Sequence, residues 1–274
     1  MPSVKLAVTS DLHLPITSST AIADLAREVE AFAPEALVVA GDVGESLENI
    51  ARCLALLKRF VACPVWVLPG NHDLWARGAS SRRLWEELMP RTVEQADCHW
   101  LEGKAFVRHG VAVAGTIAWY DYSAADPHVK APARIFAENK RYYNMDGTYI
   151  DWDWSDLQFA ELAAEPFLAT LDRLDADPAV RQTVVVTHVP LLECQMCRDS
   201  GNADWAFSNA YFGNLTLGAK VLQRKKVTHV ISGHTHVGRE AHVQLEDGRL
   251  VEARVLASEY GNPAWLGLTL SADP

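Results

Sequence analysis

Five short apolar segments of this 274-residue chain are each followed, within three residues, by one or more Asp, Asn or His residues. Each segment has the length of a strand buried inside a sheet. The segments are Val4–Thr9, Ala36–Ala40, Val65–Leu68, Thr183–Thr187 and Val227–Ser232. In open α/β sheets, residues just beyond the carboxyl ends of the strands meet along one edge. The pattern therefore predicts an α/β fold that gathers residues distant in sequence into one polar site.

Helical patterns separate these segments. Apolar residues at helical spacing predict helices over Ser19–Phe32, Ser46–Phe60, Ser80–Met89 and Ser155–Leu174. Shorter strand-like patterns occur at Ala105–Val107 and Val111–Gly115, and a β-hairpin is expected over Ala241–Leu256 with its turn at Glu246-Asp247-Gly248. Alternation of strands and helices predicts a parallel sheet covered by helices on both faces. Because no repeat or low-complexity linker divides the chain, we expect a single domain over residues 1–274.

The polar residues after the segments form five motifs in a fixed order. They are Asp11-Leu12-His13, Gly41-Asp42, Gly70-Asn71-His72-Asp73, His188 and Gly233-His234-Thr235-His236. Alternation within Asp11-x-His13 and within His234-x-His236 would place both side chains of each pair on one side of an extended segment. The motifs thus bring carboxylates, an amide and imidazoles to the same sheet edge.

These side chains have the chemistry of metal ligands. Two carboxylates, one amide and four imidazoles suit Mn²⁺, Fe²⁺, Zn²⁺, Co²⁺ or Ni²⁺ better than Mg²⁺ or Ca²⁺. One ion cannot take all of them and keep positions open for substrate, so the set predicts two ions that share a bridging carboxylate. The predicted ligands are Asp11, His13, Asp42, Asn71, His188, His234 and His236.

The motif series, which spans residues 11 to 236, resembles that of the calcineurin-like metallophosphoesterase superfamily, including its class III phosphodiesterases. The resemblance implies a four-layer α/β/β/α sandwich of two mixed sheets in place of a single parallel sheet. It implies one divalent ion held by Asp11, His13 and His236. A second ion would be held by Asn71, His188 and His234, with Asp42 bridging the two. Mn²⁺ is the ion we expect first.

The resemblance also implies catalytic roles for two residues of the third motif. His72 would protonate the leaving oxygen, a task for which imidazole suits because it titrates near neutral pH. Asp73 would orient His72 or support its charged form. The metals would lower the pKa of a bridging water and draw charge from the phosphoryl oxygens. The implied activity is metal-dependent hydrolysis of phosphoesters.

Aromatic residues concentrate in two irregular stretches, residues 119–156 and 191–213. We interpret the first as a cap-like insertion over a ligand pocket, since loops often carry function and aromatic side chains make pocket walls. Packing of these side chains at the surface is the alternative. An aromatic cap could stack a base or a phenyl group, which favours a phosphodiesterase.

Two other functions compete with the phosphodiesterase. A phosphomonoesterase would need extra cations for its dianionic substrate, and Lys140 and Arg141 are the candidates. Arg77, shortly after the third motif, is interpreted either as a residue that reaches the phosphate or as a solvated helix residue. A non-catalytic metal-binding scaffold is less favoured, because scaffold members of this fold typically lose ligands or the catalytic His, and this chain keeps them all.

Composition limits the partners. The formal net charge of −10 disfavours a long nucleic acid, so we expect a small phosphoester substrate, with nucleotides among the candidates. No apolar stretch approaches the roughly 20 residues that a membrane-spanning helix needs. The first residues lack the pattern of a signal peptide, and we expect a cytoplasmic protein.

Cys194 and Cys197 form one CxxC pair, which we interpret as two reduced thiols, with a redox or zinc site as the alternative.

Overall fold

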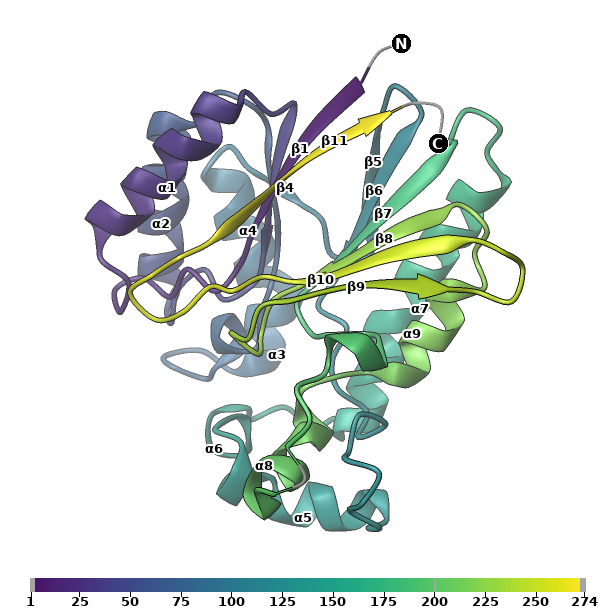
Figure 1. Ribbon diagram of the computed structural model, residues 1–274. Helices are drawn as coiled ribbons and strands as arrows, with labels where there is room; N and C mark the ends of the chain where they lie inside the picture. The colour runs from purple at the N-terminus through teal and green to yellow at the C-terminus, as the bar shows by residue number, and fades with distance from the viewer. Residues whose placement is uncertain (1–2, 200, 272–274) are drawn as a thin grey trace.

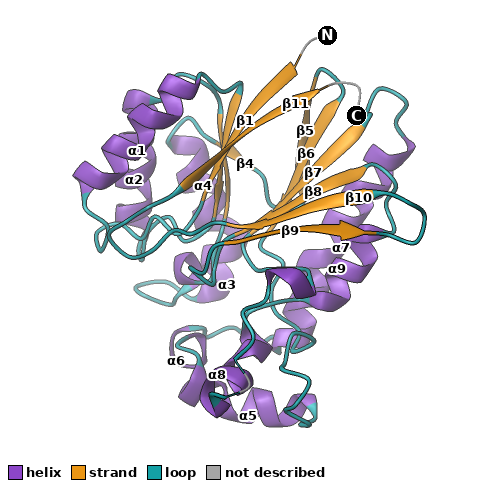
Figure 2. Ribbon diagram, in the orientation of Figure 1, coloured by secondary structure: helices purple, strands orange, loops and turns teal. Residues whose placement is uncertain are grey.

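The computed structural model describes residues 3–199 and 201–271. Two β-sheets pack face to face, and helices cover the outer face of each sheet (Figures 1 and 2). The strand order is β11-β1-β2-β3-β4 in one sheet and β5-β6-β7-β8-β10-β9 in the other. The predicted four-layer α/β/β/α sandwich of two mixed sheets is thereby confirmed.

The first sheet contains the strands that carry the first three motifs. Its members are β1 (Ser3–Thr9), β2 (Ala36–Ala40), β3 (Val65–Leu68), β4 (His99–Trp100) and β11 (Trp265–Ser271). Strands β1 to β4 run parallel, and β11 pairs antiparallel with β1. The helices on its outer side are α1 (Ser19–Phe32), α2 (Leu47–Phe60) and α4 (Met89–Gln95). Helix α2 begins after Ser46, whose hydroxyl accepts the Asn49 N–H as a helix cap.

The second sheet carries the fourth and fifth motifs. Its members are β5 (Lys104–Arg108), β6 (Val111–Thr116), β7 (Gln182–Thr187), β8 (Val227–Ser232), β9 (Arg239–Gln244) and β10 (Leu250–Val255). Strands β6, β7, β8 and β10 are parallel, whereas β5 and β9 are antiparallel edge strands. Strands β9 and β10 form the predicted hairpin. The helices on the outer side of this second sheet are α7 (Asp156–Ala176) and α9 (Leu215–Leu222).

Apolar side chains fill the spaces between the layers. Leu6, Val38, Val113, Val184 and Ile231 are among the residues packed between the two sheets, and none of them is more than 1% exposed. Strands buried on both faces read as continuous apolar runs, which is why five of them could be identified from sequence. No helix within residues 3–199 and 201–271 is both long and apolar enough to cross a membrane.

The helix expected over Ser80–Met89 is interrupted and longer than predicted. It starts as α3 (Ser81–Arg83), widens into a π-helical turn over Leu84–Leu88 and continues as α4 to Gln95. Pro90, near the start of α4, has no N–H to donate to the preceding turn. The N–H of Met89 reaches back to Leu84, five residues earlier, which is the hydrogen bond of a π-turn.

The two aromatic stretches come together in a small lobe below the sandwich (Figure 1). The lobe is built from α5 (Ala133–Tyr143), α6 (Asp146–Tyr149) and α8 (Ala203–Ser208). The Tyr211 hydroxyl donates to the Phe136 carbonyl at 2.8 Å, which joins the two stretches. Trp119 and Tyr120 are fully buried in the core, whereas Trp152 and Trp154 of the same stretch border a small pocket.

Glu102 is an unexpected buried carboxyl group in the loop between β4 and β5. Its carboxyl oxygens lie 2.6 Å from Thr116 Oγ1 and 2.6 Å from Ile117 N. Burial raises the pKa of Glu102 from 4.5 to about 8, although both hydrogen bonds act to lower it. The folded chain therefore keeps this proton at pH values where the unfolded chain has lost it. Its contribution to stability is complete below about pH 4.5 and is lost as the pH rises through 8.

We expect Glu102→Gln to remove this pH dependence, because a neutral amide reproduces the hydrogen bonds of the protonated acid. At pH 8 the free energy of unfolding of the variant should exceed that of the wild type by about 2–4 kcal/mol. At pH 4.5 the two proteins should have nearly equal free energies of unfolding. Urea titrations at both pH values measure this difference. Glu161→Gln, on the exposed side of α7, is the control. An identical effect of Glu102→Gln at both pH values would contradict a raised pKa of Glu102 in the folded chain.

Candidate metal centre

The nine predicted site residues all lie where β1, β2, β3, β7 and β8 end, on the side of the sandwich that faces the lobe. They come from segments up to 225 positions apart (residues 11 to 236) and meet through side-chain contacts. The convergence predicted from the five motifs is therefore present in the fold.

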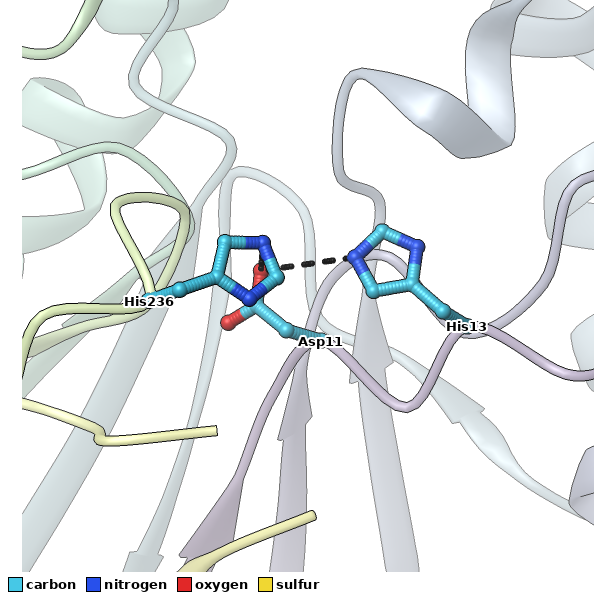
Figure 3. Close-up of side chains that lie close together, drawn as sticks. All are labelled: Asp11, His13 and His236. Atoms are coloured by element: carbon cyan, nitrogen blue, oxygen red, sulfur yellow. Dashed lines mark ion pairs between the residues drawn. The ribbon is translucent and has the colours of Figure 1, made fainter. Parts of the chain in front are cut away.

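Asp11, His13 and His236 form the first group (Figure 3). Asp11 Oδ1 lies 4.0 Å from His13 Nε2 and 3.8 Å from His236 Nε2. Both ring nitrogens of His13 are buried and have no hydrogen-bond partner in the described part of the chain. Leaving a buried polar atom unpaired costs about 1–3 kcal/mol. A cation between these three side chains would satisfy the imidazole.

Asn71, His188 and His234 form the second group. Asn71 Oδ1 lies 3.0 Å from His188 Nε2 and 3.1 Å from His234 Nδ1. The other nitrogen of each ring donates to a backbone carbonyl, Ala40 for His188 and Tyr211 for His234. The nitrogens that face Asn71 are therefore unprotonated in neutral imidazoles. Three lone pairs point at one another, an arrangement that a cation stabilises and that no hydrogen bond satisfies.

Asp42 lies between the two groups. Its Oδ2 atom is 3.5 Å from His13 Nε2 in the first group and 3.5 Å from His188 Nε2 in the second. Its Oδ1 atom accepts the backbone N–H of His72 at 2.9 Å, which fixes the carboxylate. At this position one carboxylate is within reach of an ion in either group. The donor set fits two divalent transition-metal ions, as expected from the sequence.

The protonation of the histidines also fits metal binding. Burial lowers the pKa of His13 to about 3 and that of His188 to about 3. Both rings are therefore neutral near pH 7, which is the form that ligates metals. Burial raises the pKa of Asp42, and bound cations would act in the opposite direction.

The backbone at the motifs is unusual. Asp11, His13, Asp42, His234 and His236 all have positive φ, at 55°, 44°, 52°, 71° and 58°. The prediction of extended Asp11-x-His13 and His234-x-His236 segments is therefore wrong. Left-handed turns, not strand alternation, bring each pair together. Such conformations cost of order 1–3 kcal/mol each and cluster at functional sites.

Two glycines make these turns possible. Gly41 has a φ of 88°, and a Cβ atom there would lie 2.6 Å from His188 Nδ1. At Gly70 a Cβ atom would collide with the Asp42 carboxylate. Both positions therefore require glycine so that the backbone can approach the ligands closely.

His72 lies beside the two groups and is surrounded by other side chains. Its Nδ1 atom is 3.5 Å from Glu45 Oε1, and its ring stacks on Trp75 with centroids 3.7 Å apart. Arg77 Nη1 lies 2.6 Å from Glu45 Oε2. Burial acts to lower the pKa of His72, but the carboxylates of Asp42, Glu45 and Asp146 together raise it to about 9. Without bound cations, these carboxylates favour a protonated imidazole.

The role expected of Asp73 stays a prediction, and its carboxylate and a charged His72 stabilise each other. Its carboxylate accepts the backbone N–H groups of Val43 at 3.0 Å, Gly44 at 3.1 Å and Gly70 at 2.9 Å. Asp73 thereby ties the loop of the second motif to that of the third. The carboxylate beside the His72 ring belongs to Glu45, which sequence reasoning missed although it lies three residues after Asp42.

Asp146, the first residue of α6, is a second residue that was missed. Its buried carboxylate accepts Asn71 Nδ2 at 2.8 Å, Trp75 Nε1 at 2.7 Å and the Tyr120 hydroxyl at 2.9 Å. It thus turns the Asn71 amide so that the oxygen faces His188 and His234. It also fixes the indole that stacks on His72. No sequence signal marks this residue, which lies 75 positions after Asn71.

We expect Asp146→Ala to weaken metal binding in the second group, because the Asn71 amide loses the acceptor that orients it. Removal of such an outer hydrogen bond typically lowers metal affinity roughly 10- to 100-fold. Calorimetric titration of metal-free protein with Mn²⁺ measures the change. Asp146→Asn keeps an acceptor oxygen and should lose much less. Unchanged affinity in a folded Asp146→Ala protein would refute this role.

The cations proposed for a phosphate dianion are engaged elsewhere. Lys140 Nζ lies 2.6 Å from the buried Asp156 carboxylate, and Arg141 Nη2 donates to the Tyr142 hydroxyl at 2.6 Å. Lys140 therefore supports the core of the lobe. Cys194 and Cys197 are free thiols.

Known proteins share this fold and sequence pattern. An [acyl-carrier-protein] phosphodiesterase, PptH from Mycobacterium tuberculosis, is 28% identical over 195 residues, which cover 62% of this chain and 58% of that protein. The match thus spans less than two thirds of the relative's length. The crystal structure of phosphopantetheinyl hydrolase (PptH) from M. tuberculosis superposes with a TM-score of 0.68 at 21% identity and covers 96% of each chain. A dimetal phosphatase from Danio rerio gives a TM-score of 0.56 at 14% identity, over 93% of this chain and 88% of that one.

The two solved structures establish the fold. The family follows from a separate match, in which the sequence profile for calcineurin-like phosphoesterases covers residues 4–238. That range includes all five motifs and both groups of ligands. It confirms the resemblance inferred from the motifs and the expected enzyme class. The chain belongs to the calcineurin-like phosphoesterase family.

Proposed function

We propose that this protein is a phosphodiesterase that works with two divalent transition-metal ions, Mn²⁺ being the first choice. The observation that carries the proposal is the position of Asp42 Oδ2, 3.5 Å from an imidazole of each ligand group and 4.0 Å from His72 Nε2. When bound, such ions supply a water of lowered pKa and positive charge for the phosphoryl oxygens.

The protein's own residues supply the proton. A protonated His72 is placed to donate to the oxygen of the leaving group, a contribution worth roughly 100- to 10,000-fold in rate. Glu45 favours the charged ring, and the stacked indole of Trp75 fixes its orientation. We assign Asp73 a positioning role, because its hydrogen bonds hold the loops that carry Asp42 and Asn71.

The charges around His72 favour a diester over a monoester. A phosphomonoester dianion would call for free cations, but Arg77 is paired with Glu45 at 2.6 Å. Lys140 is buried against Asp156. Glu45 adds a negative charge that opposes a dianion more than the singly charged diester. The name of the M. tuberculosis relative points to the same reaction class, and a diester attached to a carrier protein joins small phosphoesters as a candidate substrate.

We expect Mn²⁺-reconstituted protein to hydrolyse bis-p-nitrophenyl phosphate faster than p-nitrophenyl phosphate. His72→Ala should lower diester turnover roughly 100- to 10,000-fold without changing the bound metal, because the ring donates a proton and is not a ligand. Initial rates and elemental analysis of the same samples measure both quantities. Faster monoester hydrolysis would favour the phosphomonoesterase instead. Two bound metals with no hydrolysis of either ester would contradict the proposal.

We expect Glu45→Gln to lower kcat for the diester roughly 10-fold, because the amide keeps the shape of the side chain but no longer stabilises a charged His72. KM should change little. Glu48→Gln, a matched change on the exposed start of α2, serves as the control. If Glu45→Gln and Glu48→Gln have equal activity, Glu45 has no part in the reaction.

A further inference from the structure

Tyr260 is an exposed aromatic residue that lies directly against the first ligand group. Its ring centroid is 4.6 Å from that of His13 and 4.8 Å from that of His236, on which it stacks at 28°. The side chain is nevertheless 51% exposed, although the His13 ring that it contacts is fully buried. One face of the ring covers the metal centre, and the rest is open to solvent.

Several bonds hold this residue in place. The backbones of Glu259 and Asn262 pair at 3.1 and 2.9 Å to close a tight turn around it. Gly261 N–H donates to Thr17 Oγ1 at 3.1 Å, which joins the turn to the loop after the first motif. The Ser258 carbonyl accepts His236 Nδ1–H at 2.6 Å. The position of the ring is therefore built into the site.

Ile16, which precedes Thr17, provides a second exposed apolar side chain, at 52%. Because Thr17 is bonded to the Tyr260 turn, the two loops that carry these residues are joined.

Tyr260 and His72 both contact the His13 ring but stack on different partners. The His72 ring contacts His13 edge-on at 4.7 Å and stacks on Trp75 at 3.7 Å. Tyr260 instead covers His13 and His236. If His72 donates a proton to the leaving group, the ester group near Tyr260 is the one that stays on phosphorus.

We propose that Tyr260 forms a binding subsite for the organic group retained on phosphorus, and that this subsite selects planar or apolar groups over small aliphatic ones. The inference rests on the proposed phosphodiesterase function. Aromatic stacking of this kind corresponds to roughly 3- to 10-fold in affinity. Tyr260 is then a determinant of substrate specificity and not a metal ligand.

Two diesters with the same leaving group test the subsite. Bis-p-nitrophenyl phosphate retains an aryl group, and methyl p-nitrophenyl phosphate retains a methyl group. In the Mn²⁺-loaded protein, Tyr260→Ala should lower kcat/KM for the aryl diester roughly 3- to 10-fold, mainly through KM, and leave the methyl diester within about 2-fold. Tyr260→Phe should keep the wild-type ratio. Tyr142→Ala, which removes an exposed tyrosine of α5, is the control.

Equal losses on both diesters, or no loss on either, would overturn the subsite. An equal loss for Tyr260→Phe and Tyr260→Ala would also overturn it, because the ring would then not be the selecting group. Equilibrium binding separates this inference from the proposed function. In the His72→Ala background, Mn²⁺-loaded protein should bind diphenyl phosphate more tightly than dimethyl phosphate. Tyr260→Ala should abolish that preference even if the wild type turns over neither diester.

Discussion

The lone pairs that face one another around Asn71, His188 and His234 are the constraint on which the rest of the structure depends. Asn71 Oδ1 lies 3.0 and 3.1 Å from two ring nitrogens whose protons are on the far side of each imidazole. Asp42 adds a carboxylate 3.5 Å from His188, with the unpaired ring of His13 at the same distance on its other side. Without cations this concentration of acceptors is repulsive. With them it becomes a rigid site, and the surrounding fold can be understood as the framework that holds it together.

Much of that framework consists of strained or buried groups that would be unfavourable elsewhere. Left-handed turns at Asp11, Asp42 and His234 aim the side chains into the centre, and each is backed by bonds from its neighbours. Asp73 bonds the loops of two motifs through three backbone N–H groups. Asp146 connects the lobe to the same centre. The lobe therefore helps to position the ligands.

The sequence predicted the parts of this site that depend on strand order and donor chemistry. Apolar runs before Asp11, Asp42, Asn71, His188 and His234 sufficed to place these residues at one sheet edge, because the rule on strand ends needs no side-chain detail. Their local conformation could not be predicted, since positive φ at Asp11 or His236 arises from tertiary contacts. The same holds for Asp146 and Glu45, whose partners are known only once the chain has folded. Strand β11 was missed as well, because its pairing with β1 is a tertiary contact. The π-turn before Pro90 was also missed.

The central claim is that two ions are held on either side of Asp42. Crystals of the Mn²⁺-loaded protein, measured at the manganese absorption edge, test it directly. The account predicts two anomalous peaks per chain. One should lie among Asp11, His13 and His236, the other among Asn71, His188 and His234, with the Asp42 carboxylate touching both. A single peak, or two peaks with Asp42 bound to neither, would contradict it.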